Sequence, residues 1–422
     1  MLDRLNKFSI FTLGCKVNQS ESATMRGLLE AAGMCQAATG EKADVCVINT
    51  CTVTAKSDYQ SRQLIRRAIR HNPGARVIVT GCYSETRQAE VGGIDGAITI
   101  LPSEQKLDII RSINKNTATI GNCSDISCDA PPYSTERSRA FLKIQDGCNN
   151  SCAYCIVHVA RGRSRSIAQD QVVSAARSLE AKGFREIVLT GVHVGFYGND
   201  LGGIRLSSLL LKLLNATSHA RYRISSIEPN EVDDDLSGMI ANEERVCRHL
   251  HIPLQAANDS VLERMNRNYS ISLYFKLLER LKTRIPEICL GADIIAGFPG
   301  ETPDMFQSGF RLIDESPLNY LHVFPYSRRY GTSAASMPNQ VPSGERNNRA
   351  ALLRDLSVRK RNDYSASMVG RKVHVIAECS QDNSLVCKCL SDNYLSLHIP
   401  SELLSMDGTA MVTVRKEHFA MP

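Results

Sequence analysis

The sequence has no long hydrophobic run. Its first residues, MLDRLNKFSIFTLGC, contain no apolar stretch long enough for a signal peptide. No later segment approaches the roughly 18 consecutive apolar residues that a membrane-spanning helix needs. Of the 422 residues, 43% are hydrophobic and 22% are charged, which excludes a largely disordered chain. We therefore expect a cytoplasmic protein with two or three packed domains and no membrane partner.

The sequence also lacks a strong excess of charge of one sign. Its net charge of +6 permits a polyanionic partner such as RNA without requiring one. Cysteine, in contrast, is abundant, with 15 residues. Because a chain of this length without a secretion signal lies in a reducing compartment, we interpret these cysteines as metal ligands or buried thiols rather than disulfides.

The first 115 residues alternate between strand-like and helix-like segments, a pattern typical of an α/β domain with a parallel sheet. Helical patterns at residues 22–33 and 61–72 separate three strand-like runs, each of which ends at a cysteine: Cys15, Cys51 and Cys82. One such cysteine would be read as an ordinary buried residue. Because the carboxyl ends of parallel strands share one edge of a sheet, where ligands bind, we expect these three thiols to converge.

The remainder of the chain divides into three further parts. Residues 116–137 are rich in Ser, Thr, Asn, Asp and Pro and read as a linker after a domain of residues 1–115. Residues 138–365 contain six strand-then-helix units, which predict an incomplete TIM-like barrel with functional residues at the strand carboxyl ends. Residues 366–422 contain short β-like segments that suit a small β-barrel. The polar residues at the predicted barrel strand ends are Asp146, His193, Glu228, Gln255 and Tyr326.

A loop after the first predicted barrel strand contains three closely spaced cysteines. In LKIQDGCNNSCAYCIVHVARGRSRS, residues 142–166, Cys148, Cys152 and Cys155 are separated by four and three positions. A zinc site normally uses two C-x-x-C pairs or histidines at finger spacing, and here only His158 follows, so zinc is the weaker alternative. An iron–sulfur cluster held by three thiolates keeps one iron open, as a reactive centre requires.

This loop resembles that of the radical S-adenosylmethionine enzymes, whose motif is C-x-x-x-C-x-x-C on a partial (β/α)6 barrel. The resemblance implies a 4Fe-4S cluster on Cys148, Cys152 and Cys155, with S-adenosylmethionine at the open iron. It also implies that Tyr154 packs on the adenine of this cofactor and that Glu228 and Gln255 contact its ribose or methionine. The segment GADIIAGFPGET resembles the glycine-rich strand that contacts the adenine in this family.

Along essentially its whole length, the chain further resembles the methylthiotransferases, which join an amino-terminal domain and a radical barrel to a TRAM domain. This implies a second 4Fe-4S cluster with one open iron, which would receive the sulfur, on Cys15, Cys51 and Cys82. The segments GCKVNQSES, VINTCTVTAKSD, SRQLIRRAIR and VTGCYS are most similar to the threonylcarbamoyladenosine tRNA branch, since the other branches carry different residues after the first Gly-Cys. The implied product is 2-methylthio-threonylcarbamoyladenosine beside the anticodon.

Basic segments agree with a tRNA partner, because phosphate contacts from Lys and Arg supply most sequence-independent affinity. In ARGRSRS, we predict that Arg161 and Arg163 hold the RNA near the cysteine loop, and SRRYG, residues 327–331, is a further candidate. The resemblance also implies an electron donor such as flavodoxin or ferredoxin. We predict no catalytic residue beyond the cluster ligands.

Two alternatives remain open. The same chemistry could act on isopentenyladenosine in tRNA or on an aspartate of a ribosomal protein. A hydrophobic pocket would suit an isopentenyl group, whereas the carboxylate of a threonylcarbamoyl group needs an Arg or Lys near the second cluster. The other alternative is a non-catalytic iron–sulfur or zinc protein that binds RNA, which would not cleave S-adenosylmethionine.

Overall fold

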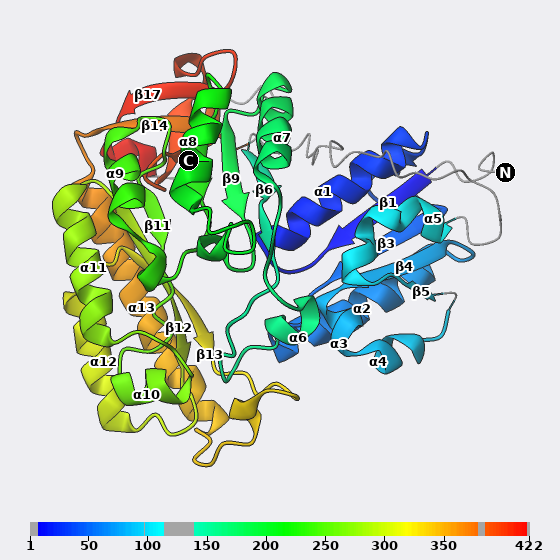
Figure 1. Ribbon diagram of the computed structural model, residues 1–422, viewed down its shortest axis with the longest axis horizontal. Coiled ribbons are helices and arrows are strands. Elements are labelled where there is room, and N and C mark those ends of the chain that lie inside the picture. The colour runs from blue at the N-terminus through cyan, green and yellow to red at the C-terminus, as the bar shows by residue number, and fades with distance from the viewer. Residues whose placement is uncertain (1–6, 97, 114–138, 379–384, 420–422) are drawn as a thin grey trace.

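The computed structural model describes residues 7–96, 98–113, 139–378 and 385–419 (Figure 1). The predicted linker at 116–137 lies outside these residues. Within the described residues, no helix is both long enough and apolar enough to cross a membrane.

The amino-terminal part is a five-stranded parallel sheet in the order β2-β1-β3-β4-β5. Its strands are β1 (Lys7–Thr12), β2 (Cys35–Gln36), β3 (Val45–Thr50), β4 (Arg76–Gly81) and β5 (Ile98–Ile100). Central β3 is buried along its whole length. Val45 and Val47 pack with the core of α1 (Lys16–Ala31) and α5 (Ile109–Ile113), and Cys46 and Ile48 pack with that of α2 (Ala55–His71). Helices thus cover both faces, as the continuous apolar pattern of this strand requires.

The middle part is an incomplete barrel. Two three-stranded parallel sheets, β10-β9-β6 and β11-β12-β13, are joined by the bridge between Tyr222 and Val246. The strands are β6 (Arg139–Lys143), β9 (Glu186–Thr190), β10 (Arg221–Ile224), β11 (His249–His251), β12 (Cys289–Ala296) and β13 (Tyr320–Pro325). Within the described part of the chain, β6 and β13 do not pair, so the barrel is open between them. The prediction of six barrel strands is confirmed.

Helices surround the barrel (Figure 1). The helices that follow its first five strands are α7 (Gln169–Ala181), α8 (Leu206–Ala216), α9 (Asp234–Asn242), α11 (Ile271–Arg284) and α12 (Pro303–Glu315). The basic segment after β13 forms α13 (Ser343–Ser367), which packs along β13.

The carboxy-terminal part is a four-stranded antiparallel sheet in the order β16-β15-β14-β17. Its strands are β14 (Lys372–Ala377), β15 (Val386–Ser391), β16 (Ser396–Pro400) and β17 (Thr409–Thr413). Two buried guanidiniums of β10 donate hydrogen bonds to its backbone: Arg221 to the carbonyls of His374 and Leu390, and Arg223 to those of Ser391 and Asp392. This sheet is therefore fixed to the end of the barrel at which the strands begin.

Candidate active site

Cys15, Cys51 and Cys82 lie at the carboxyl ends of three neighbouring strands. Cys15 is the residue that precedes α1, Cys51 directly follows β3, and Cys82 begins α3 (Cys82–Thr86) directly after β4. Gly14 has a φ of +98°, and a Cβ atom there would lie 2.8 Å from the Cys51 sulfur, so glycine is needed for these loops to meet. Burial raises the pKa of the Cys51 and Cys82 thiols, whereas the nearby charges of Arg161 and Lys106 act to lower that of Cys82.

This thiol set fits an iron–sulfur cluster with one open position. All three cysteines are free rather than disulfide-bonded. They supply three soft ligands from one sheet edge, and among the described residues no strand that adjoins this edge ends at a fourth cysteine.

Cys148, Cys152 and Cys155 form a second set in the loop between β7 (Gln145–Asp146) and α6 (Val157–Arg161). The backbone N–H of Asn150 donates to the Cys148 sulfur and that of Val157 to the Cys155 sulfur, each at 3.4 Å. Hydrogen bonds to sulfur stabilise the thiolate form that a cluster requires. The donor set therefore also fits a cluster that is held by three thiolates.

Arg267, which the sequence analysis did not identify, connects this loop to Glu228. Its Nη1 lies 3.3 Å from the Cys152 sulfur, and its Nη2 forms an ion pair with the Glu228 carboxylate. Tyr154 packs against the barrel core, and burial raises the pKa of its hydroxyl well above the usual range, although the Arg267 guanidinium acts to lower it. Two of the three predicted cofactor contacts are thus brought to one place, where their role remains a prediction.

Gln255, the third predicted cofactor contact, lies beyond the end of β11. Its φ of +64° is unusual for a residue with a side chain. Its backbone N–H donates to the carbonyl of Asp293 at 2.8 Å, and its carbonyl accepts from the N–H of Ile295 at 2.9 Å. These two bonds fix Gln255 against the end of β12, and its contact with a cofactor stays a prediction.

His193 joins Cys148 to Glu231. Its Nδ1 lies 3.5 Å from the Cys148 sulfur, and its Nε2 lies 2.6 Å from a Glu231 carboxylate oxygen. Burial lowers the pKa of His193, but the hydrogen bond to Cys148 and the contact with Glu231 outweigh this and raise it to about 10.

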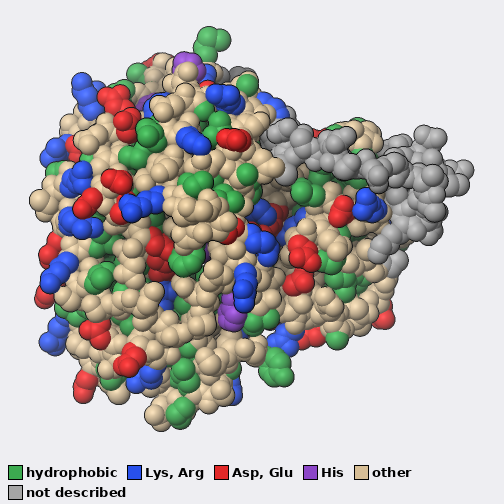
Figure 2. Space-filling view, viewed as in Figure 1, with side chains coloured by type: hydrophobic (Ala, Val, Ile, Leu, Met, Phe, Trp, Pro, Cys, Tyr) green, Lys and Arg blue, Asp and Glu red, His purple; other side chains and the backbone are tan. Residues whose placement is uncertain are grey.

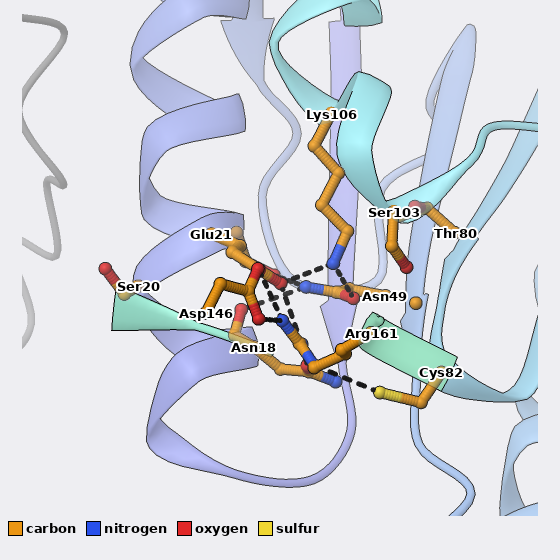
Figure 3. Close-up of polar contacts among 12 residues, drawn as sticks. Asn18, Ser20, Glu21, Asn49, Thr80, Cys82, Ser103, Lys106, Asp146 and Arg161 are labelled. Atoms are coloured by element: carbon orange, nitrogen blue, oxygen red, sulfur yellow. Dashed lines mark hydrogen bonds and ion pairs between the residues drawn. The ribbon is translucent and has the colours of Figure 1, made fainter. Parts of the chain in front are cut away.

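Arg161 points into a cluster of polar side chains (Figure 3) and is buried, contrary to the prediction that it holds the RNA. Its side chain is 1% exposed, and its guanidinium donates to Glu21 at 2.8 Å, Asp146 at 2.9 Å and Asn18 at 2.6 Å. Its Nε also donates to the Cys82 sulfur at 3.3 Å. Because all three nitrogens of the guanidinium already donate to protein atoms, Arg161 is not available to an RNA phosphate. Arg163, two residues further on, is exposed and keeps its predicted role as a proposal.

Glu21 is the centre of this buried network. Besides Arg161, its carboxylate pairs with the ammonium groups of Lys106 and, at 3.0 Å, Lys143. These cations hold the pKa of Glu21 well below its usual range even though burial raises it. Because Lys143 belongs to β6 and Glu21 to α1, the network attaches the amino-terminal sheet to the open edge of the barrel.

A second former RNA candidate is also buried. Arg329 of the SRRYG segment lies 2.6 Å from Asp58 and 2.8 Å from the Thr52 hydroxyl, next to Cys51. On the face shown in Figure 2, the described Lys and Arg side chains are interspersed with Asp and Glu and form no continuous basic patch. Basic residues in this chain therefore serve both its internal contacts and its surface.

Glu186, at the start of β9, is shared by three guanidiniums inside the barrel. Its carboxylate lies 2.7 Å from Arg221, 2.9 Å from Arg223 and 3.6 Å from Arg139. The two arginines of β10 hold the pKa of Glu186 well below its usual range, although burial raises it.

A carboxylate between two histidines lies on the neighbouring barrel strands. Asp293 of β12 is 3.0 Å from His251 of β11 and 3.4 Å from His322 of β13. Although burial raises the pKa of Asp293, the hydrogen bonds from these histidines lower it below its usual range. The carboxylate is therefore ionised and already has its partners.

Comparisons with known proteins agree with this geometry. The Radical SAM superfamily model matches residues 142–313, and the model of an uncharacterized protein family, UPF0004, matches residues 7–101. The solved structure of a radical S-adenosylmethionine methyltransferase from Kitasatospora setae superposes with a TM-score of 0.57 at 15% identity, over 78% of this chain and 77% of that chain. The fold and the cysteine loop thus define a radical S-adenosylmethionine enzyme.

The similar curated proteins narrow the class. Several of them, including those from Bacillus subtilis and Rickettsia prowazekii, are named threonylcarbamoyladenosine tRNA methylthiotransferase. The Bacillus subtilis protein is 38% identical over 92% of this chain and 88% of its own length, and the Rickettsia prowazekii protein is 38% identical over 87% of both. A tRNA-2-methylthio-N(6)-dimethylallyladenosine synthase from Syntrophomonas wolfei is 33% identical over 88% of this chain and 86% of its own length. The chain belongs to the threonylcarbamoyladenosine tRNA methylthiotransferase family.

Proposed function

We propose that this protein adds a methylthio group to carbon 2 of threonylcarbamoyladenosine, next to the anticodon of tRNA. Its cofactors are two 4Fe-4S clusters and S-adenosylmethionine. Cys148, Cys152 and Cys155 would hold the cluster whose chemistry is the one-electron cleavage of S-adenosylmethionine, and Cys15, Cys51 and Cys82 would hold the cluster that binds the sulfur at its open iron. The reaction takes place in the cytoplasm, with an electron donor such as flavodoxin or ferredoxin.

The contact between Arg161 and Cys82 carries this proposal. α6 begins two residues after Cys155, and its last residue, Arg161, donates a hydrogen bond to Cys82 of the other thiol set. The helix that follows one thiol set therefore contacts the other set, an arrangement that suits two clusters acting on one substrate base. A radical generator and a sulfur source are useful together only if they share one substrate.

The chain's own residues hold this arrangement. Arg267 binds the Cys152 sulfur and fixes Glu228 beside it. His193 and two backbone N–H groups fix the other sulfurs of the loop. We divide the chain into a first domain (1–115), a linker (116–137), the barrel (138–365) and a final domain (366–422). In this division the first domain and the barrel each hold one thiol set, and the final domain binds RNA.

Mass spectrometry of tRNA nucleosides tests the proposal in cells. A strain that lacks its own enzyme should form 2-methylthio-threonylcarbamoyladenosine when it carries this gene, and should not form it when it carries a Cys15→Ala copy. A methylthio group on isopentenyladenosine instead would show that the proposed substrate is wrong and that the proposed reaction is right. The absence of any methylthio nucleoside would contradict the proposal.

A further inference from the structure

The aromatic ring of Tyr330 is held out in the solvent by a tight turn. This turn follows β13, and in it the backbone N–H of Thr332 donates to the carbonyl of Arg329 at 3.2 Å. Gly331 provides the positive φ, +88°, that the turn requires. Tyr330, at the tip of the turn, is 81% exposed.

The turn is anchored beside the thiol set of the amino-terminal domain. Arg329 is buried, and its guanidinium lies 2.6 Å from Asp58 and 2.8 Å from the hydroxyl of Thr52. Thr52 directly follows Cys51. The residue that precedes the exposed tyrosine therefore binds the loop that carries one of the predicted cluster ligands.

The same segment is also anchored to the thiol set of the barrel. The backbone N–H of Ala334 donates to the carbonyl of Ala153 at 2.9 Å, and the hydroxyl of Ser333 donates to the same carbonyl at 3.4 Å. Ala153 lies between Cys152 and Cys155. The turn that bears Tyr330 thus contacts both cysteine-bearing loops.

Two arginines accompany the Tyr330 ring. The guanidinium carbon of Arg87 lies 5.2 Å from the ring centroid, and Arg87 directly follows the helix that begins at Cys82. Arg87 also pairs with Glu90 at 3.4 Å, and Arg328, two positions before the tyrosine, is exposed. Because most of the ring is exposed, Arg87 leaves its opposite face open. An open aromatic face beside arginines suits an unpaired nucleotide, whose base stacks on the ring while its phosphate attracts the cations.

We propose that the Tyr330 ring stacks on the base of the anticodon loop that adjoins the modified adenosine. The inference rests on the proposed function, in which this loop approaches both thiol sets. Bases of a single-stranded loop can leave their neighbours and stack on an aromatic side chain. When the adenosine turns out of the loop to expose carbon 2, the base beside it loses a stacking partner, and the Tyr330 ring takes that place. Tyr330 is thus a positioning residue for the RNA.

Binding of anticodon stem-loop RNAs to the cluster-containing protein tests this inference. One RNA carries threonylcarbamoyladenosine in an intact loop, and two others lack the base on its 5′ or its 3′ side. Tyr330→Ala should weaken binding of the intact RNA about five- to hundredfold, the effect of losing one stacked base. Wild-type protein should bind one of the abasic RNAs more weakly by a similar factor. Tyr330→Ala should weaken that RNA by less than about twofold further, because the stacking partner is already absent.

Two variants of the same turn serve as controls. Tyr330→Phe keeps the ring and should retain most of the affinity. Arg328→Gln removes an exposed charge, so it should weaken the three RNAs equally and reduce the dependence of their affinity on salt. Tyr330→Ala should leave this salt dependence unchanged and should keep the wild-type iron content, because its side chain is exposed.

The outcomes separate the inference from the proposed function. If Tyr330→Ala binds the intact RNA as the wild type does, or if its effect adds fully to the loss of either base, the inference is wrong while the proposed function stands. If Tyr330→Ala instead slows only the reaction driven by flavodoxin and not that driven by a chemical reductant, the ring serves the electron donor and the inference is also wrong. Failure of the wild type to form the methylthio nucleoside would contradict the proposed function, whatever the binding experiment shows.

Discussion

The Nε of Arg161 donates a hydrogen bond to the sulfur of Cys82 across 3.3 Å. Arg161 ends the short helix that follows one thiol set, and Cys82 belongs to the other. The same guanidinium binds Glu21 and Asp146, so a single side chain joins the two thiol sets to the ion pairs that attach the amino-terminal sheet to the barrel.

Replacement of Arg161 should destabilise this junction. In Arg161→Met, the buried carboxylate of Glu21 and the partly buried carboxylate of Asp146 lose a shared cation, which should cost about 3–5 kcal/mol of the free energy of unfolding. Arg163→Met, at an exposed position two residues further on, should change it by less than about 0.5 kcal/mol. Urea unfolding of the two variants checks this. Equal stability of both would show that the Arg161 network does not hold the sheet to the barrel.

The two thiol sets should be separable by substitution. Cys152→Ser should lose about half of the iron and all cleavage of S-adenosylmethionine. Cys51→Ala should also lose about half of the iron but keep the cleavage and lose the methylthio product. Iron analysis and detection of 5′-deoxyadenosine measure both effects. Buried Cys247, which belongs to neither set, is the control, and Cys247→Ser should keep its iron.

Burial of His249 should make stability depend on pH. Its ring is 1% exposed, and burial, followed by the charges of Arg223 and Lys16, lowers its pKa well below 6.5. Below about pH 6.5, the His249 ring binds a proton in the unfolded chain but not in the folded chain. The stability of the fold that depends on neutral His249 is therefore fully present above about pH 6.5. It falls as the pH decreases below that value, by at most about 1.4 kcal/mol per pH unit.

Urea unfolding at several pH values between 7.5 and 5 tests this dependence. His249→Gln should show a smaller loss of stability at low pH than the wild type. His71→Gln, at an exposed position of α2, should follow the wild type. A wild-type slope in His249→Gln would mean that other groups cause the loss at low pH.

The strands and the thiol sets could be predicted because their signals are local. Apolar runs such as VCVIN and RVIVTG are buried on both faces and end at a cysteine. The first residue of α1 was harder to predict. The pattern indicated a helix from residue 22, whereas the structure begins it at Lys16. Asn18 and Glu21 in its first turns are polar, yet both are buried and accept hydrogen bonds from Arg161.

The roles of the arginines could not be predicted for the same reason. In ARGRSRS, sequence alone does not distinguish the buried Arg161 from the exposed Arg163, because two of the partners of Arg161, Glu21 and Asn18, lie 140 and 143 positions earlier in the chain. Arg267 had no motif, and its contacts with Cys152 and Glu228 exist only in the folded barrel. A charged side chain is buried where partners from distant parts of the chain pair with it, and a local sequence pattern does not reveal those partners.

The measurement with the most decisive outcome is a reaction of purified, cluster-containing protein with S-adenosylmethionine, a reductant and an anticodon stem-loop that carries threonylcarbamoyladenosine. Mass spectrometry should detect the addition of one methylthio group at that nucleoside, together with 5′-deoxyadenosine. The matching isopentenyladenosine stem-loop should remain unmodified. Modification of the isopentenyladenosine RNA alone, or release of 5′-deoxyadenosine without a methylthio product on either RNA, would contradict the proposed function.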